Sequence, residues 1–272
     1  MASMNVLFSI RKRYDNCRFY SLEISSLYTS LTFNSLITIL FVYFYAMIKH
    51  IFCLLILLIS ISNKAGSGIP PAGNEERTDL YTTLNLQEKG LAPEVFELAI
   101  KGHRHLDADS KLRNSGILTI VDLSQSSVNK RMYVIDLNRR ELLFNTLVAH
   151  GRNTGEEYAR HFSNKQDSFE SSLGFYITSE EIWGPKVGLS MLLDGMEKGF
   201  NDNARQREII MHGAEYATED YIRKTGRLGR SYGCPTVPPE LVKPVVETIK
   251  EGTCLFIYYP DEQYIKRSAL LN

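Results

Sequence analysis

The sequence lacks the features that mark a nucleic-acid-binding or metal-binding protein. Lysine plus arginine and aspartate plus glutamate each number 31, so the formal net charge is zero. A protein that binds nucleic-acid phosphates usually carries a basic excess, so we expect no nucleic-acid partner. No HExxH motif occurs, and the cysteine spacing fits no zinc site. We therefore predict neither a metal nor another cofactor.

Cysteine is also scarce, with only Cys17, Cys53, Cys234 and Cys254 in the chain. The first two lie in an N-terminal region that a mature protein would lose if its leader were cleaved. The other two are too few for a disulfide scaffold. With 272 residues, 44% of them hydrophobic, the chain can bury a core without such cross-links.

A long uninterrupted apolar run is missing from the N-terminal region. Two shorter runs, 36–47 and 51–61, are separated by Lys49 and His50. Each is shorter than the about 20 residues that a membrane-spanning helix needs. Joined, they would place a lysine near the middle of the membrane, at a cost of roughly 2.5–3.5 kcal/mol. From Met47, MIKHIFCLLILLISISNKAG has the basic start, apolar core and small polar end of a secretory signal peptide.

We therefore predict three regions. Residues 1–63 form an N-terminal leader or extension, either a signal peptide from Met47 or an uncleaved membrane anchor over 36–62. Residues 64–110 form a glycine- and proline-rich linker followed by a helix over 92–106. Residues 111–262 form the main domain. Either form of the leader sends the rest of the chain across a membrane, and we expect membrane contact only through this leader.

Strand-like segments dominate the main domain. Three segments rich in β-branched and aromatic residues, 117–123, 131–137 and 142–149, are separated by polar turns and predict a meander. Further strands are expected at 173–178, 208–211 and 254–259. Apolar spacing predicts a helix over 239–250, bent or delayed by Pro244. The glycine-dotted segment 183–200 is expected to be a loop that covers a site. The fold class is therefore mainly β with few helices.

The segment GRLGRSYGCPTVPP, residues 226–239, places Cys234 on a tight, exposed corner. Pro235 has no N–H group, so the amide after the cysteine cannot donate to a developing oxyanion. An oxyanion hole would have to use the amides of Tyr232, Gly233 and Cys234.

A cysteine nucleophile needs a neighbouring base, usually histidine. His150 in VAHG and His212 in IIMHG each end an apolar strand and precede glycine. Sequence spacing does not choose between them. Arg227 and Arg230 are either solvated charges or ligands for a substrate carboxylate.

These residues carry a resemblance to a known family. MHGAEY followed by GRLGRSYGCP resembles the YkuD-type L,D-transpeptidases, in particular the branch described as the murein L,D-transpeptidase catalytic domain family. The resemblance covers about residues 116–260 and includes LLFNTLVAHGRNTG, SSLGFY and LLDGMEKGFNDNAR. It implies a YkuD-like catalytic domain with a mixed β-sandwich.

The resemblance also implies residue roles. Cys234 matches the nucleophile and His212 the base, while the Gly213 carbonyl is placed to orient the imidazole. Ser231 and Gly233 match the serine and glycine of the cysteine motif.

The chain departs from the family pattern at two places. Tyr232 stands where the family often has histidine, and Pro235-Thr236 replaces an apolar residue and an arginine. Arg230 and Arg227 are our candidates to replace that arginine in substrate binding.

The function implied is an L,D-transpeptidase that takes peptidoglycan tetrapeptide stems as donor, through a Cys234 thioester. A stem amine as acceptor gives 3→3 cross-links, whereas water gives L,D-carboxypeptidase activity. The expected location is the cell envelope, in the periplasm. The alternatives are a non-catalytic envelope protein that binds wall peptides, with an inert Cys234, and an ordinary cysteine peptidase that cuts L,L bonds.

Overall fold

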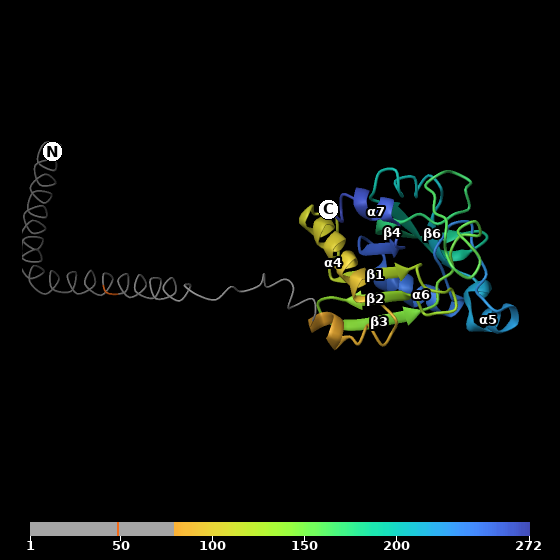
Figure 1. Cartoon of the computed structure of the whole chain (residues 1–272), viewed down its shortest axis with the longest axis horizontal. Helices are drawn as coiled ribbons and strands as arrows, with labels where there is room; N and C mark the ends of the chain where they lie inside the picture. Colours follow the sequence, from red (N-terminus) through yellow and green to blue (C-terminus); the bar gives the residue numbers. More distant parts are fainter. Residues whose placement is uncertain (1–47, 49–78) are drawn as a thin grey trace, which may run out of the picture. The chain divides into compact units, whose positions relative to one another are not determined.

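The computed structural model describes residue 48 and residues 79–272 (Figure 1). The predictions of a leader over 1–63 and of a linker before residue 79 therefore lie outside the described residues, apart from residue 48. Within the described part, the structure contains no helix with the length and apolar character needed to cross a membrane.

One mixed sheet of eight strands organises the described domain. In sequence order the strands are β1 (Ile117–Asp122), β2 (Met132–Asp136), β3 (Glu141–Thr146), β4 (Gly174–Gly184), β5 (Gly188–Gly195), β6 (Ile210–Gly213), β7 (Thr236–Val237) and β8 (Cys254–Tyr258). Their order across the sheet is β3-β2-β1-β8-β4-β5-β6-β7. β1 and β8 pair in parallel, as do β6 and β7, and the other neighbours are antiparallel. The predicted mainly β fold and the predicted meander over β1, β2 and β3 are confirmed.

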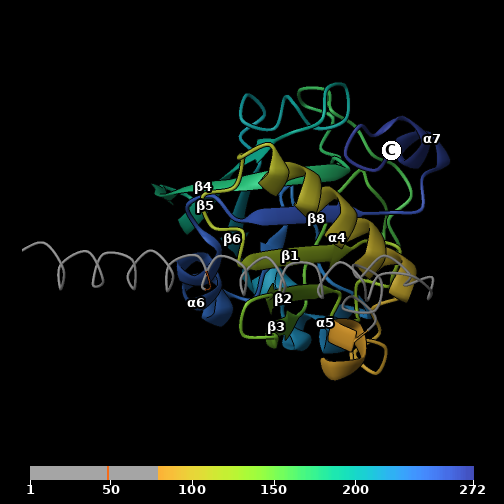
Figure 2. The same ribbon diagram turned by 90° about the vertical axis from the view of Figure 1, so that its left-hand side faces the viewer.

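Helix α4 (Pro93–Ala108) closely follows the predicted helix and covers part of the sheet. Its apolar face buries Phe96 and Ile100, and the helix contacts β1 and β8 (Figure 2). Gly102 allows this close packing, because a Cβ atom there would lie 2.0 Å from the ring of Phe175. Burial of each large apolar side chain stabilises the fold by about 1.5–3 kcal/mol.

Helix α6 (Pro239–Ile249) begins at the predicted residue and packs on β5 and β6. Pro244 lies inside this helix without delaying its start. Two further helices, α5 (Glu219–Thr225) and α7 (Glu262–Arg267), and a 3₁₀ turn, η1 (Glu215–Ala217), were not predicted. Thr218 and Asp261 cap the two helices by accepting hydrogen bonds from backbone amides.

The predicted covering loop over 183–200 is wrong. Residues 188–195 of this segment are β5, which forms a long hairpin with β4 and pairs on its other side with β6. The glycines that suggested a loop lie mainly at the ends of the strands, at Gly184, Gly188 and Gly195. The hairpin matters for the site, because Ser190 of β5 is paired with His212 of β6.

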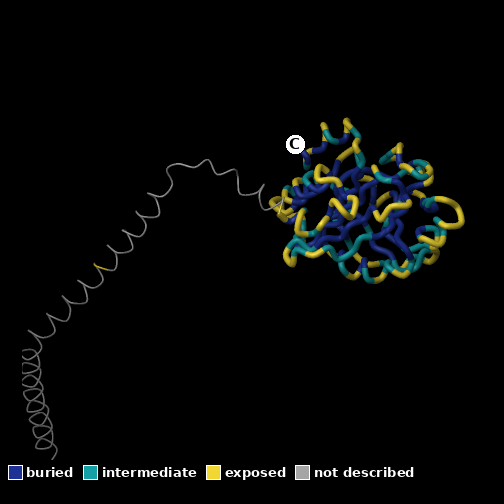
Figure 3. The backbone as a smooth tube through the Cα atoms, turned by 60° about the horizontal axis from the view of Figure 1, so that its bottom comes forward, coloured by how far each residue is buried: buried dark blue, intermediate teal, exposed yellow. Residues whose placement is uncertain are grey.

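Buried residues concentrate in the sheet and beneath its helices, whereas the connecting loops are largely exposed (Figure 3). A small separate apolar cluster contains Leu147, Ala149, Ala217 and Leu228. This cluster anchors the segment that leads into Cys234, since Leu228 is fully buried in it.

Candidate active site

Cys234 and His212 are brought together by the pairing of β6 with β7. His212 lies on β6 directly opposite Thr236, the first residue of β7, and Cys234 precedes Thr236 by two residues. The two predicted catalytic residues are thus placed on adjacent segments at one end of the sheet.

The turn that carries Cys234 is held by the hydroxyl of Ser231. This hydroxyl donates to the carbonyl of Cys234 at 2.7 Å and accepts from the amide of Gly233 at 3.1 Å. Gly233 has a φ of +122°, and a Cβ atom there would lie 2.8 Å from the carbonyl oxygen of Glu170. The turn therefore requires glycine at this position, in the place that the sequence predicted.

The hydrogen bond to Ser231 changes the predicted set of oxyanion donors. The amide of Gly233 is already donated to Ser231, so it is not free in this structure. The amides of Tyr232 and Cys234 have no acceptor among the described residues. Of the three predicted donors, Gly233 is therefore removed and two amides are left.

The imidazole of His212 is buried and has a defined orientation. Its Nδ1 lies 3.2 Å from the carbonyl oxygen of Gly213, which is the contact expected from the resemblance. Because a carbonyl only accepts, Nδ1 carries the proton in this contact and Nε2 is the basic nitrogen. Burial lowers the pKa of His212, so the ring is neutral at neutral pH.

A chain of hydroxyl groups leads to Nε2 of His212. The hydroxyl of Thr236 lies 3.2 Å from this nitrogen and 3.2 Å from the hydroxyl of Tyr216. With Nε2 as acceptor, Thr236 donates to His212 and Tyr216 donates to Thr236. Thr236, which stands where the family often has arginine, therefore contacts the predicted base.

The thiol of Cys234 lies in a partly enclosed pocket of the backbone. Its sulfur is 3.7 Å from the carbonyl oxygen of Glu208, and the amide of Ile210 donates a hydrogen bond toward it. Burial raises the pKa of the thiol, whereas the Ile210 amide and the charge of Arg207 lower it. Burial dominates, so the resting residue is a thiol near neutral pH.

Arg207 is a neighbour of the site that sequence reasoning missed. Its buried guanidinium donates to the carbonyl oxygens of Ser163 and Glu170 and to the hydroxyls of Ser168 and Ser172. No carboxylate pairs with it among residues 79–272. It therefore ties the loop over 163–172 to the turn that precedes β6 and leaves a positive charge near the sulfur. No local pattern marks it, because all of these contacts are distant in sequence.

We predict a specific pH dependence for alkylation of Cys234. Because burial raises the thiol pKa, the rate of reaction with iodoacetamide should still rise above about pH 8.5, the pKa of an unperturbed thiol. Arg207→Met should move this profile to higher pH, and Arg207→Lys should move it less, because it keeps the charge. Mass spectrometry of the Cys234 peptide measures the rate separately from other cysteines. A rate that is already constant at pH 7 would contradict the prediction.

His150, the alternative base, is buried and contacts protein groups through both ring nitrogens. The ring is buried, with Nδ1 accepting from the guanidinium of Arg131 at 2.8 Å and Nε2 lying 3.3 Å from the carbonyl oxygen of Gly155. Burial, reinforced by the charge of Arg131, lowers the pKa of His150 to about 3. Its backbone carbonyl accepts from the amide of Ser231, so it supports the cysteine turn from behind.

Arg227 and Arg230, the predicted carboxylate ligands, both pair with the carboxylate of Glu156. Each guanidinium lies 2.6 Å from one of its oxygens. Arg230 also donates to the carbonyl oxygens of Arg152 and Gly155. In this structure these two arginines join the cysteine segment to the loop over 151–157, and they share the single negative charge of one protein carboxylate.

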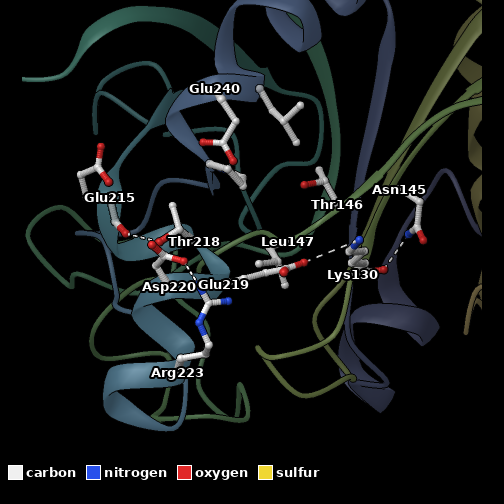
Figure 4. A pocket seen from close by; sticks show the side chains of 12 residues that line it. Lys130, Asn145, Thr146, Leu147, Glu215, Thr218, Glu219, Asp220, Arg223 and Glu240 are labelled. Atoms are coloured by element: carbon white, nitrogen blue, oxygen red, sulfur yellow. Dashed lines mark hydrogen bonds and ion pairs between the residues drawn. The ribbon is translucent and has the colours of Figure 1, made fainter.

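A cavity of about 560 Å³ is lined by residues near the starts of α5 and α6 (Figure 4). Its lining includes Glu215, Glu219, Asp220 and Glu240, and neither Cys234 nor His212 contributes to it. Because no cysteine or histidine lines it, we place the candidate site at Cys234 rather than in this cavity. The described residues also contain no cluster of three or more side chains suited to hold a metal ion.

The fold and the site define a mainly β domain in which a glycine-shaped turn presents a cysteine beside a strand-borne histidine. The family model described as L,D-transpeptidase catalytic domain (YkuD_2) matches residues 87–258, which is more than half of the chain. The chain therefore belongs to the L,D-transpeptidase catalytic domain family. No functionally curated protein matches the sequence.

Several solved structures also match the chain, and two of the three described here are L,D-transpeptidases by title. An L,D-transpeptidase from Mycobacterium smegmatis has 12% identity, covers 53% of this chain and 59% of its own, and has a TM-score of 0.33. One from Mycobacterium tuberculosis H37Rv has 13% identity, coverage of 53% and 58%, and a TM-score of 0.32. The Bdellovibrio bacteriovorus protein Bd1075 has 16% identity, coverage of 54% and 50%, and a TM-score of 0.35. The match thus spans about half to three-fifths of each solved chain.

Proposed function

We propose that this domain is a cysteine acyltransferase that acts on the peptide stems of peptidoglycan. Membership of the L,D-transpeptidase catalytic domain family supports the substrate class. The observation that carries the proposal is the pairing of β6 with β7, which places His212 beside the segment that bears Cys234. The contact of Nδ1 with the Gly213 carbonyl leaves Nε2 available as the base.

In the first half of the proposed reaction, the Cys234 thiol turns from Glu208 toward Nε2 of His212 and gives up its proton to that nitrogen. The sulfur attacks the carbonyl carbon of the third stem residue, which we expect to be a diaminopimelate. The amides of Tyr232 and Cys234 donate to the oxyanion. His212 then protonates the amine of the departing D-amino acid, and a thioester remains on the sulfur.

In the second half, an acceptor replaces the D-amino acid. His212 removes a proton from the incoming nucleophile, which attacks the thioester carbonyl, and the departing sulfur takes that proton back. An amine from a neighbouring stem yields a 3→3 cross-link, and water yields a shortened stem. The segment that we expected to cover the site lies largely in a hairpin, so it gives no reason to exclude water, and we keep water as an alternative acceptor.

The protonation states support a base-assisted attack. Burial raises the pKa of the Cys234 thiol and lowers the pKa of the His212 imidazole, which favours a neutral pair in the resting enzyme. The nucleophile is then formed only when proton transfer accompanies attack. Export through the N-terminal leader to the periplasm would place the domain beside its substrate, and we retain this location as part of the proposal.

Purified disaccharide-tetrapeptide tests this proposal and separates its alternatives. We expect mass spectrometry to show loss of the terminal D-amino acid, with cross-linked dimers if a stem amine is the acceptor and a tripeptide stem if water is. Cleavage of an L,L bond instead would favour an ordinary cysteine peptidase. No conversion, together with binding of the stem, would favour a non-catalytic wall-binding protein.

A further inference from the structure

Arg152 lies over two exposed aromatic rings at the edge of the candidate active site. The centre of its guanidinium is 6.0 Å from the centroid of the Phe169 ring and 5.8 Å from that of Tyr232. The two rings are 4.9 Å apart and tilted by 51°. Phe169 is 36% exposed and Tyr232 65%, so the three side chains form a surface platform rather than part of the core.

This platform, Arg152 with Phe169 and Tyr232, is joined through its backbone to the turn that carries Cys234. The amide of Arg152 donates to the carbonyl oxygen of Ser231 at 2.7 Å, and that of Asn153 donates to the carbonyl oxygen of Phe169 at 3.1 Å. Tyr232 belongs to the turn itself. A ligand attached at Cys234 would therefore lie beside the platform.

Arg152 differs from the other arginines near Cys234 in having no anionic or hydrogen-bonding partner for its side chain among residues 79–272. Arg227 and Arg230 share the carboxylate of Glu156, and Arg207 donates to four oxygens of the neighbouring loop. The five N–H donors of a guanidinium match both oxygens of a carboxylate. Stacking on aromatic rings holds such a group in one plane while its donors stay free.

The backbone at Phe169 supports a role outside folding. Phe169 has a φ of +57°, a conformation that costs a bulky residue of order 1–3 kcal/mol. Because Phe169 remains 36% exposed, burial of its ring offsets only part of that cost. Strain of this kind persists where a side chain must be held in a particular position, here under the guanidinium of Arg152.

We propose that Arg152, oriented by Phe169 and Tyr232, binds a free carboxylate of the donor stem. This inference rests on the proposed function for the class of ligand. Two carboxylates fit the chemistry, the side-chain carboxylate of a diacid at the third stem position and the carboxylate of the terminal D-amino acid. The platform takes the substrate-binding role that we had predicted for Arg227 and Arg230.

Calorimetric binding to the full chain carrying Cys234→Ala, which cannot turn the ligand over, tests this site. Three tetrapeptide stems are compared: one with both carboxylates free, one amidated at the third-residue side chain and one amidated at the C-terminus. Adding Arg152→Met should weaken binding of the free stem by about 10–100-fold, as expected for loss of a charged hydrogen-bonded pair. One of the two amidated stems lacks the carboxylate that Arg152 binds. The affinity of that stem should not change with Arg152→Met, and this result identifies the carboxylate.

Arg139→Met is a matched control, because Arg139 is an exposed arginine paired with Asp136 in the β2–β3 turn. It should leave all three affinities unchanged. Equal weakening of all three stems by Arg152→Met, or no weakening of any, would overturn the inference. Turnover of the free stem by the protein with Cys234 intact is measured separately. Carboxylate-selective binding without turnover would reject the proposed function and keep the Arg152 site.

Discussion

Replacing Cys234 with alanine should lower both transfer and hydrolysis of stem peptides by about 10⁴-fold or more. The variant removes the only atom that can form the proposed thioester and leaves the turn around it unchanged. Ser231 still donates to the carbonyl of residue 234, and the shape of the turn depends on Gly233 rather than on the thiol. We therefore expect the free energy of unfolding to change by less than about 1.5 kcal/mol.

Cys254→Ala is the matched control for this experiment. Cys254 is fully buried in β8, and burial raises its thiol pKa far above the ordinary value, so it is inert. Its replacement should cost about 1–2 kcal/mol of stability through lost packing and leave turnover per folded molecule unchanged. Turnover is measured by mass spectrometry of the released D-amino acid. Activity retained in Cys234→Ala would exclude the mechanism.

The two histidines that the sequence left as alternative bases should give opposite results. His212→Ala should lower kcat by about 10²–10⁴-fold, because it removes the group that moves protons in both halves of the reaction. The free energy of unfolding should change much less than kcat does. The substitution removes only the hydrogen bonds to the Gly213 carbonyl and the Thr236 hydroxyl.

His150→Ala should instead cost about 2–5 kcal/mol of unfolding free energy. The fully buried guanidinium of Arg131 would lose its contact with Nδ1, and the Gly155 carbonyl would keep only its donor from Arg230. Turnover per folded molecule should fall far less than in His212→Ala. Urea unfolding and steady-state kinetics on the same preparations separate the two effects. A larger loss of kcat in His150→Ala than in His212→Ala would reassign the base.

Much of the fold follows from local patterns in the sequence. The alternation and β-branched content of 117–149 predict three strands, and apolar spacing predicts both α4 and α6. β7 has only two residues, and its strand character exists through pairing with β6, so no periodicity reveals it. β5 was missed because its terminal glycines resemble those of a loop, although its central residues are paired on both sides.

The candidate site, like the fold, could be predicted only in part from local sequence. Glycine and proline predict the shape of the turn at Cys234, because their backbone preferences are local. The partners of the surrounding polar groups are set by tertiary structure. Neither the capture of the Gly233 amide by Ser231 nor the sharing of Glu156 by two arginines has a signal at that position in the sequence. Arg152 was missed for the same reason, since its aromatic neighbours come from two other loops.

The proposed chemistry gives a reason for threonine, rather than arginine, at position 236. Its hydroxyl contacts Nε2 of His212, the nitrogen that must accept the thiol proton. An arginine at this position would place a positive charge beside that nitrogen and oppose its protonation. If Arg152 binds the substrate carboxylate instead, the imidazole of His212 lies beside neutral hydroxyl groups.

Peptide mass spectrometry of the trapped acyl-enzyme tests the central claim most directly. The full chain is mixed with disaccharide-tetrapeptide, quenched in acid within the first turnovers and then digested. We predict a mass increase equal to the substrate without its terminal D-amino acid, located on the peptide that contains Cys234 and absent from Cys234→Ala. Formation of product with no such adduct at any quench time, or an adduct on a different residue, would contradict catalysis through Cys234.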